Sequence, residues 1–312
     1  MWQWFVISAA LSASTVFQSG NDCIRREAYG PALSAVWQSS DSAAPVSTLE
    51  GFARRVIQDA NATGFIHVRD VDSGQVVHVA ASGQPDLASS SPIPPLSIIK
   101  VYLAAEWLEQ GFGSTVVDCG AGSKLRPMLI DEVLISGCDS AGERMAVILR
   151  QKLGSRRMLR ELRRYGLDSV SLRPDASDAE WGHVLSLGEE KVPVTPQQLS
   201  AFMRAIGQGG AGLFSERTAS RLRTSLEGVV ERGTADAIKN ALAGTGWRIG
   251  GKTGTGRGQC GEHCDGWFAS LLSDQDRPRY VILVFIRGRG IGGGLAAKTA
   301  VSVAEFLIEQ RP

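Results

Sequence analysis

The two ends of the chain carry short apolar runs of the kind found in β-strands. Residues 65–68 and 76–79 are β-prone runs, and residues 72–74 (Asp-Ser-Gly) supply a turn between them. This pattern predicts a β-hairpin. Near the other end, residues 280–286 form one continuous apolar run with the length of a buried strand. A helix is expected after it, over residues 296–309.

The remainder of the chain has the spacing of amphipathic helices. A capping-box pattern at residues 47–50 begins a first helix. Apolar positions then recur at helical spacing over residues 97–109, 128–165, 195–207 and 215–242. Strands near both ends with helices between them indicate an α+β fold. We expect an antiparallel sheet made from both chain ends, with a helical region inserted.

Composition fits a chain that buries a substantial core. Of 312 residues, 43% are hydrophobic and 21% are charged, which is ordinary for a globular protein. The net charge of +1 gives no electrostatic reason to expect nucleic acid as a partner. No internal apolar run approaches the length of a membrane span. We expect residues 47–312 to form a single domain.

The amino-terminal residues have the features of an export signal. Residues 2–13 are apolar and end in small side chains, although no Lys or Arg precedes them. Residues 20–46 are rich in Ser, Ala and Pro, which is typical of a leader or linker. We interpret residues 1–46 as a signal-like leader and linker of an exported protein, periplasmic or otherwise extracytoplasmic. A buried strand or helix is the alternative, and the segment could be cleaved or kept as a membrane anchor.

Five cysteines, an odd number, do not make a complete disulfide framework. Cys260 and Cys264 flank a Gly-Glu-His triplet. A disulfide that closes this tight loop is the preferred interpretation for an exported protein. Two free thiols come second, and zinc comes last because no second ligand pair is visible nearby. We expect no metal and no organic cofactor.

Ser97 and Lys100 form an S-x-x-K pattern at the start of a predicted helix. The first turn of a helix has unpaired N–H groups, and residues three apart share a face. A serine hydroxyl needs a base before it becomes a nucleophile. Lys100 could serve only when neutral, which requires burial and a neighbouring cation such as Lys252. A serine cap with a solvent-exposed lysine is the alternative interpretation.

A Lys-Thr-Gly tripeptide at residues 252–254 is a rarer pattern than S-x-x-K. Its flanking glycines indicate a strand that another group approaches closely. Lys252 and Thr253 could hold a substrate carboxylate. The N–H groups of Thr255 and Ser97 could form an oxyanion hole. The alternative is a glycine-rich turn with an exposed lysine.

A serine followed by lysine, a second serine and a Lys-Thr-Gly strand together make up an acylating serine site. The sequence resembles the penicillin-recognising serine enzymes, and more closely a penicillin-binding transpeptidase domain. The resemblance covers roughly residues 60–310. Besides the motifs, it rests on residues 68–74, 95–105, 185–188, 194–199, 233–235 and 266–268.

The second motif departs from the family pattern, which is Ser-x-Asn. The best match places Ser136 as the proton-relaying serine and puts Cys138 where an amide would contact substrate. A thiol is a poorer hydrogen-bonding group than an amide. A second alignment matches Cys138, Asp139 and Ser140 to the end of the family's Ser-Asp-Asn motif. This alignment shifts the motif serine out of place. Cys138 as the primary nucleophile is a weaker alternative, because no base is identifiable beside it.

The resemblance implies a penicillin-binding serine D,D-peptidase, either a transpeptidase or a carboxypeptidase. It would act on the D-Ala-D-Ala stem peptides of peptidoglycan, and β-lactams would be covalent inhibitors. One alternative is a serine β-lactamase with Glu180 activating water, and another is a catalytically weak β-lactam sensor or scaffold. The acceptor and the oligomeric state stay open. The expected catalytic residues are Ser97, Lys100, Ser136 and Lys252, and the expected substrate-binding residues are Cys138, Thr253, Gly254 and Thr255.

Overall fold

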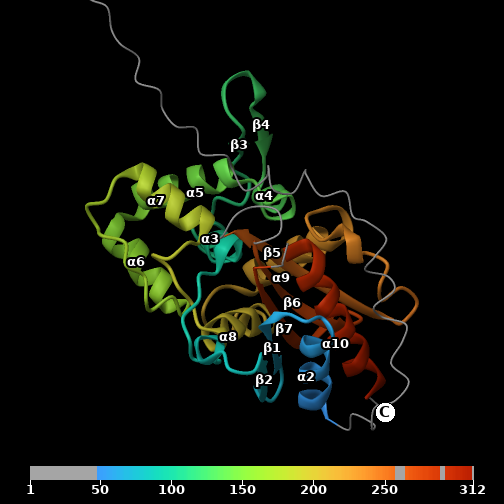
Figure 1. Ribbon diagram of the computed structural model, residues 1–312. Coiled ribbons are helices and arrows are strands. Elements are labelled where there is room, and N and C mark those ends of the chain that lie inside the picture. The colour runs from blue at the N-terminus through green and yellow to red at the C-terminus, as the bar shows by residue number, and fades with distance from the viewer. Residues whose placement is uncertain (1–47, 257–263, 289–291, 311–312) are drawn as a thin grey trace, which may run out of the picture.

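A computed structural model describes residues 48–256, 264–288 and 292–310. Its centre is a five-stranded antiparallel sheet in the order β2-β1-β7-β6-β5 (Figure 1). Strand β1 pairs along its full length with β7, so the two ends of the chain meet in one sheet. This arrangement confirms the predicted α+β fold. The strands are β1 (Thr63–Asp70), β2 (Val76–Ala80), β5 (Trp247–Gly256), β6 (Asp265–Asp274) and β7 (Arg277–Arg287).

Both faces of the sheet are buried. Along β7, Ile282 and Val284 pack into one apolar core, while Leu283 and Phe285 pack into the other. Burial on both faces explains why this strand is a continuous apolar run. Helices α2 (Leu49–Asp59) and α10 (Ala297–Glu309) cover the first face. Helix α8 and the helices beyond it cover the second face (Figure 1).

The inserted helical region surrounds one central helix, α3, which is buried on nearly all sides. Helices α5, α7 and α9 pack against it (Figure 1). The helix predicted over 128–165 is divided at Gly137 and Gly154, where positive φ angles of 70° and 76° end a helix. The helices are α3 (Ile99–Glu109), α4 (Ile130–Ser136), α5 (Asp139–Leu153), α6 (Ser155–Arg164), α7 (Asp178–Leu187), α8 (Pro196–Gly207) and α9 (Glu216–Arg232).

A short hairpin, β3 (Val117–Cys119) and β4 (Arg126–Met128), projects from the helical region (Figure 1). Neither this hairpin nor helix α7 was predicted. No helix in the described ranges is long and apolar enough to cross a bilayer. The signal-like leader, residues 1–46, lies outside the described residues.

Candidate active site

Ser97 lies on a tight turn that leads into α3. This 3-10 turn spans Leu96–Ile98, and Leu96 has a φ of 53°, an uncommon backbone conformation for a bulky residue. The N–H of Leu96 donates to Gly188 O at 2.9 Å. A Cβ atom at Gly188 would lie 2.1 Å from Leu96 O, so only glycine fits there. The loop after α7 therefore holds the turn that presents Ser97.

Lys100 lies in the first turn of α3 and is 1% exposed. Its ammonium donates to Ser97 Oγ at 3.0 Å, to Asp139 Oδ1 at 2.7 Å and to Ser186 O at 2.6 Å. Since an ammonium has three N–H donors, all of them are used. The contact between Ser97 and Lys100 agrees with the sequence prediction. The contacts with Asp139 and Ser186 were not predicted.

Helices α5 and α7 both contact Lys100 and pack directly against each other. The Ser186 hydroxyl on α7 donates to Asp139 O at 2.8 Å. A Cβ atom placed on Gly142 would lie 2.6 Å from Ser186 Oγ and 3.1 Å from Lys100 Cε. The close approach of these helices therefore requires glycine at position 142. Asp139 is the first residue of α5, where the helix dipole favours a carboxylate.

Lys252, on β5, is the second buried lysine of the site and is 1% exposed. Its Nζ donates to Thr253 O at 3.0 Å, and Thr253 Oγ1 lies 2.6 Å from Thr234 Oγ1. Within the described ranges, no carboxylate forms an ion pair with Lys252. Burial, followed by the nearby Lys100 charge, lowers the pKa of Lys252 to about 7, although the Asp139 carboxylate opposes this shift.

Strand β5 passes directly beside the Ser97 turn. A Cβ atom at Gly254 would lie 3.2 Å from both Pro95 O and Leu96 Cβ. Thr255 Oγ1 accepts a hydrogen bond from Gly292 N at 3.1 Å. The fold thus brings the Lys-Thr-Gly strand next to Ser97. Thr253, Gly254 and Thr255 all lie in the part of β5 that was proposed to bind substrate.

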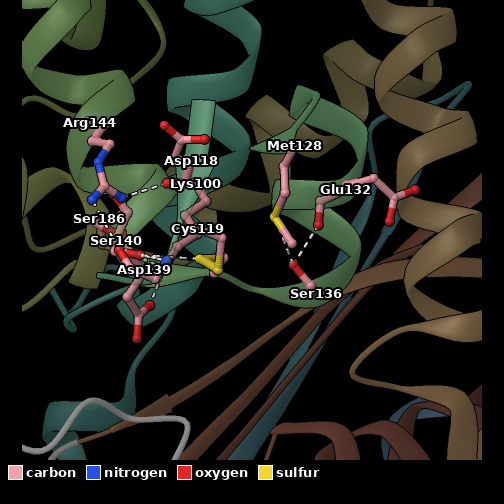
Figure 2. Close-up of a disulfide and its surroundings, with 12 residues drawn as sticks. Lys100, Asp118, Cys119, Met128, Glu132, Ser136, Asp139, Ser140, Arg144 and Ser186 are labelled. Atoms are coloured by element: carbon pink, nitrogen blue, oxygen red, sulfur yellow. Dashed lines mark hydrogen bonds and ion pairs between the residues drawn. A yellow bond between two sulfur atoms is a disulfide. The ribbon is translucent and has the colours of Figure 1, made fainter. Parts of the chain in front are cut away.

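The second motif differs from the sequence prediction. Ser136 is the last residue of α4, and its hydroxyl donates back to Glu132 O at 2.6 Å and lies 3.8 Å from Met128 Sδ (Figure 2). Among the residues described, these two atoms are its hydrogen-bond partners. A serine inside a helix commonly bonds to the preceding turn in this way. The residue of this segment that contacts Lys100 is Asp139, so the geometry favours the second alignment over the Ser136 alignment.

Cys138 forms a disulfide with Cys119 of β3 and is 3% exposed. It therefore presents no thiol to a substrate, which corrects the prediction of a substrate-binding side chain and removes the nucleophile alternative. Gly137 has no side chain on the Lys252 side, where a Cβ atom would lie 3.6 Å from Lys252 Nζ. The Cys119–Cys138 bond was missed because the two residues are 19 positions apart and share no local pattern.

The Cys260–Cys264 disulfide stays a prediction, since Cys260 lies outside the described residues. Cys264 itself is buried, immediately before β6. In the portion of the chain that the structure describes, no three His, Cys, Asp or Glu side chains are grouped so that they could hold a metal ion.

Glu180, the proposed water-activating residue of the β-lactamase alternative, lies in the first turn of α7. Its carboxylate forms an ion pair with Lys191. It precedes Ser186 by six residues, which is about 9 Å along a helix axis. Lys100 contacts α7 at the opposite end, through Ser186 O. The β-lactamase alternative therefore gains no support from Glu180.

Three solved structures show how widely this fold is shared. The D,D-transpeptidase domain of a peptidoglycan glycosyltransferase from Eggerthella lenta is 17% identical with a TM-score of 0.64, covering 84% of this chain and 81% of that chain. Penicillin binding protein 3 from Mycobacterium tuberculosis, complexed with aztreonam, is 20% identical with a TM-score of 0.64, covering 84% and 76%. A peptidoglycan glycosyltransferase from Burkholderia ambifaria is 19% identical with a TM-score of 0.67, covering 84% and 94%.

At such low identity these structures establish the fold alone. No curated protein sequence matches this one. The family model for the penicillin binding protein transpeptidase domain matches residues 64–305. That range includes β1, the Ser97 turn, the helical region and the Lys-Thr-Gly strand, which is most of what the structure describes. A match of this extent means that the chain belongs to the penicillin-binding protein transpeptidase domain family.

Proposed function

We propose that the protein is a penicillin-binding serine D,D-peptidase, a transpeptidase or carboxypeptidase. Its substrates are the D-Ala-D-Ala stem peptides of peptidoglycan. Ser97 Oγ attacks the carbonyl carbon of the D-Ala-D-Ala bond, forms an acyl-enzyme and releases the terminal D-Ala. The acyl group then passes to an amine or to water. β-Lactams acylate the same serine and remain attached.

The observation that carries this proposal is the contact between Lys100 Nζ and Ser97 Oγ at 3.0 Å, at the start of a buried helix. A positioned base within hydrogen-bonding distance is what a serine nucleophile requires. We assign Lys252 and Thr253 to the substrate carboxylate. We assign the N–H groups of Ser97 and Thr255 to the oxyanion hole, where one donor contributes about 3 kcal/mol.

A β-lactam-binding sensor or scaffold with weak turnover is the second candidate. The observation that favours it is the second motif, in which the Ser136 hydroxyl bonds within its own helix and Cys138 is in a disulfide and offers no amide. A site of this kind could form an acyl-enzyme slowly and lack efficient transfer to an acceptor. The β-lactamase hypothesis is less favoured, because Glu180 pairs with Lys191.

We also infer that the protein works outside the cytoplasm and that residues 47–312 form one catalytic domain. The Cys119–Cys138 disulfide supports the first inference, because disulfides persist in oxidising compartments. The family match over residues 64–305 supports the second. Stem peptides of peptidoglycan would be the partners in that compartment.

The test is covalent labelling with a fluorescent penicillin, in the intact protein and in Ser97→Ala. A stable adduct in the intact protein and none in the variant supports the proposal and the sensor alike. Rapid release of hydrolysed penicillin supports a β-lactamase. No labelling of the intact protein contradicts all three. Release of D-Ala from a D-Ala-D-Ala peptide, or its exchange for another D-amino acid, then separates the peptidase from the sensor.

A further inference from the structure

Lys100 has a carboxylate as a direct partner. Asp139 Oδ1 lies 2.7 Å from Lys100 Nζ, and the Asp139 side chain is 14% exposed. The other two acceptors of the ammonium are Ser97 Oγ and Ser186 O. An ammonium whose three protons are all donated has no lone pair with which to accept a proton from Ser97. Lys100 must therefore lose a proton before Ser97 can react.

Neither Gly137 nor Ser136 offers a hydroxyl route for that proton. Gly137 lacks a side chain, although a Cβ atom there would lie only 3.6 Å from Lys252 Nζ. The Ser136 hydroxyl donates a hydrogen bond to Glu132 O within the same helix. Asp139 is within hydrogen-bonding distance of Lys100 and has a carboxylate that can accept a proton.

We propose that Asp139 accepts a proton from Lys100, which frees Lys100 to take the proton of Ser97. This inference rests on the proposed acylation of Ser97 and specifies its proton path. Asp139 acts through Lys100, so it is a positioning residue that also stores a proton. An asparagine at this position could orient Lys100 but could not take its proton.

The step balances in atoms and charge. A Lys100 proton moves to Asp139 Oδ1, which leaves a neutral amine beside a carboxylic acid. The Ser97 proton then moves to the Lys100 lone pair while Ser97 Oγ bonds to the carbonyl carbon, whose π electrons move to oxygen. When that intermediate collapses, the C–N bond breaks. The leaving nitrogen takes a proton from Lys100, and Asp139 returns its proton to Lys100.

Other charged groups lie on the elements packed against the pair, in the portion of the chain that is described. On α5, Arg144 donates to Ser140 O and to the carbonyls of Asp118 and Gly120. On β5, Lys252 faces the pair and keeps its own proton only below about pH 7. On α5, one turn beyond Asp139, Glu143 lies 3.9 Å from His183 of α7, and both are half exposed. Helices α4 and α9 contribute Asp131 and Arg221, which pair with each other, and α3 itself carries the buried Glu106 two turns beyond Lys100.

The experiment measures the limiting acylation rate at saturating penicillin from pH 5 to 10, in the intact protein and in Asp139→Asn. We expect the rate of the intact protein to be level across the neutral range. In Asp139→Asn, Lys100 must instead lose its proton to solvent, which lysines ordinarily do near pH 10. We expect that variant to be about 100-fold slower at pH 7, with a rate that climbs roughly tenfold per pH unit.

Asp118→Asn is the matched control, because it makes the same chemical change on the neighbouring strand β3 and should leave the profile unchanged. Thermal unfolding of each variant separates misfolding from a change in proton transfer. An Asp139→Asn profile parallel to that of the intact protein would overturn the inference while leaving acylation of Ser97 in place. A loss in Ser136→Ala as large as in Asp139→Asn would also overturn it. Failure of the intact protein to acylate would contradict the proposed function itself.

Discussion

The two buried lysines of the site are equally inaccessible but differ in how their charge is balanced. Both are 1% exposed. Lys100 has a carboxylate, a hydroxyl and a carbonyl as acceptors. Lys252 has the carbonyl of the next residue as its main acceptor, and burial lowers its pKa to about 7. A buried charge is tolerated when it is paired and hydrogen-bonded, and is costly otherwise.

This difference indicates that the two lysines have different roles. All three N–H donors of Lys100 have acceptors within the protein, so its geometry is fixed before substrate binds. Lys252 lacks a carboxylate among the described residues, and a substrate carboxylate would supply one. The protein thus keeps one lysine paired for proton transfer and leaves the other to be paired by its ligand. The following predictions test that contrast, starting with the largest expected effect.

Lys100→Met should lower the acylation rate about 1,000-fold, because Ser97 loses its base. It should also lower the free energy of unfolding by about 3 kcal/mol, since Asp139 is left as a buried charge without its cation. Penicillin labelling and urea denaturation measure the two effects. Adding Asp139→Asn should restore most of the stability and none of the activity. An unchanged free energy of unfolding in Lys100→Met would contradict the ion pair between Lys100 and Asp139.

Lys252→Met should have the opposite effect on stability. A buried amine without a carboxylate is replaced by an apolar chain of similar length, so the free energy of unfolding should rise by about 1–3 kcal/mol. Acylation by a penicillin that carries a carboxylate should fall about 100-fold. Penicillin labelling and urea denaturation again measure the two effects. A loss of stability as large as that of Lys100→Met would show that the two lysines do not differ as described.

Removing the Cys119–Cys138 disulfide should disturb the Lys100 side of the site and spare the Lys252 side. The double variant Cys119→Ser/Cys138→Ser should lose about 3 kcal/mol of stability. Acylation should slow about tenfold, because Cys138 directly precedes Asp139. Arg144 and Ser140 still hold Gly120, the residue after β3, to α5, which limits the loss. Affinity for the penicillin carboxylate should be unchanged, and reductant should slow acylation more in the intact protein than in the double variant.

Raising the pH above 7 should weaken carboxylate binding, because Lys252 loses its charge there. Its folded pKa of about 7 lies below its unfolded value, so the unfolded chain binds a proton that the folded chain releases between pH 7 and about 10. Stability should therefore rise over that range while affinity for a penicillin falls several-fold by pH 8.5. The methyl ester of the same penicillin is the control. An equal fall for the ester would exclude Lys252 as the cause.

The pKa of His67 shows whether burial can cause such a pKa shift away from the site, because His67 lies in β1 and not beside Ser97. Its ring contacts His78 Nδ1 at 3.2 Å and Ser200 Oγ at 2.8 Å. Burial, aided by His78 and Arg69, lowers the pKa of His67 to about 3. Stability should fall as pH drops below 6.5, by about 1–2 kcal/mol at pH 5. Urea denaturation should show a smaller fall in His67→Gln, and an identical fall would contradict this assignment.

Much of the fold was predictable because its signals are local. The apolar run of β7, the hairpin of β1 and β2, and the cap at residues 47–50 that begins α2 are each contained in a few adjacent residues. Hairpin β3–β4 and helix α7 were missed. The hairpin consists of two three-residue strands, and one of them includes a proline.

The site was predictable where a motif spans one turn or one strand. Ser97 with Lys100, and the Lys-Thr-Gly strand, meet as expected. The second motif was not predictable, because Ser136 and Asp139 are three residues apart and tertiary packing decides which one faces Lys100. Helix α4 continues through Ser136, whose hydroxyl bonds to Glu132 O, and the disulfide joins Cys138 to Cys119.

The left-handed backbone of Leu96 has a consequence for how the reactivity of Ser97 depends on folding. At a bulky residue that conformation stores about 1–2 kcal/mol of strain. It persists because Gly188 O accepts the Leu96 N–H. If the loop after α7 loosens, the turn relaxes and Ser97 withdraws before the molecule unfolds. Penicillin labelling would then report the local opening of one loop, and a short peptide with the same S-x-x-K pattern would be inert.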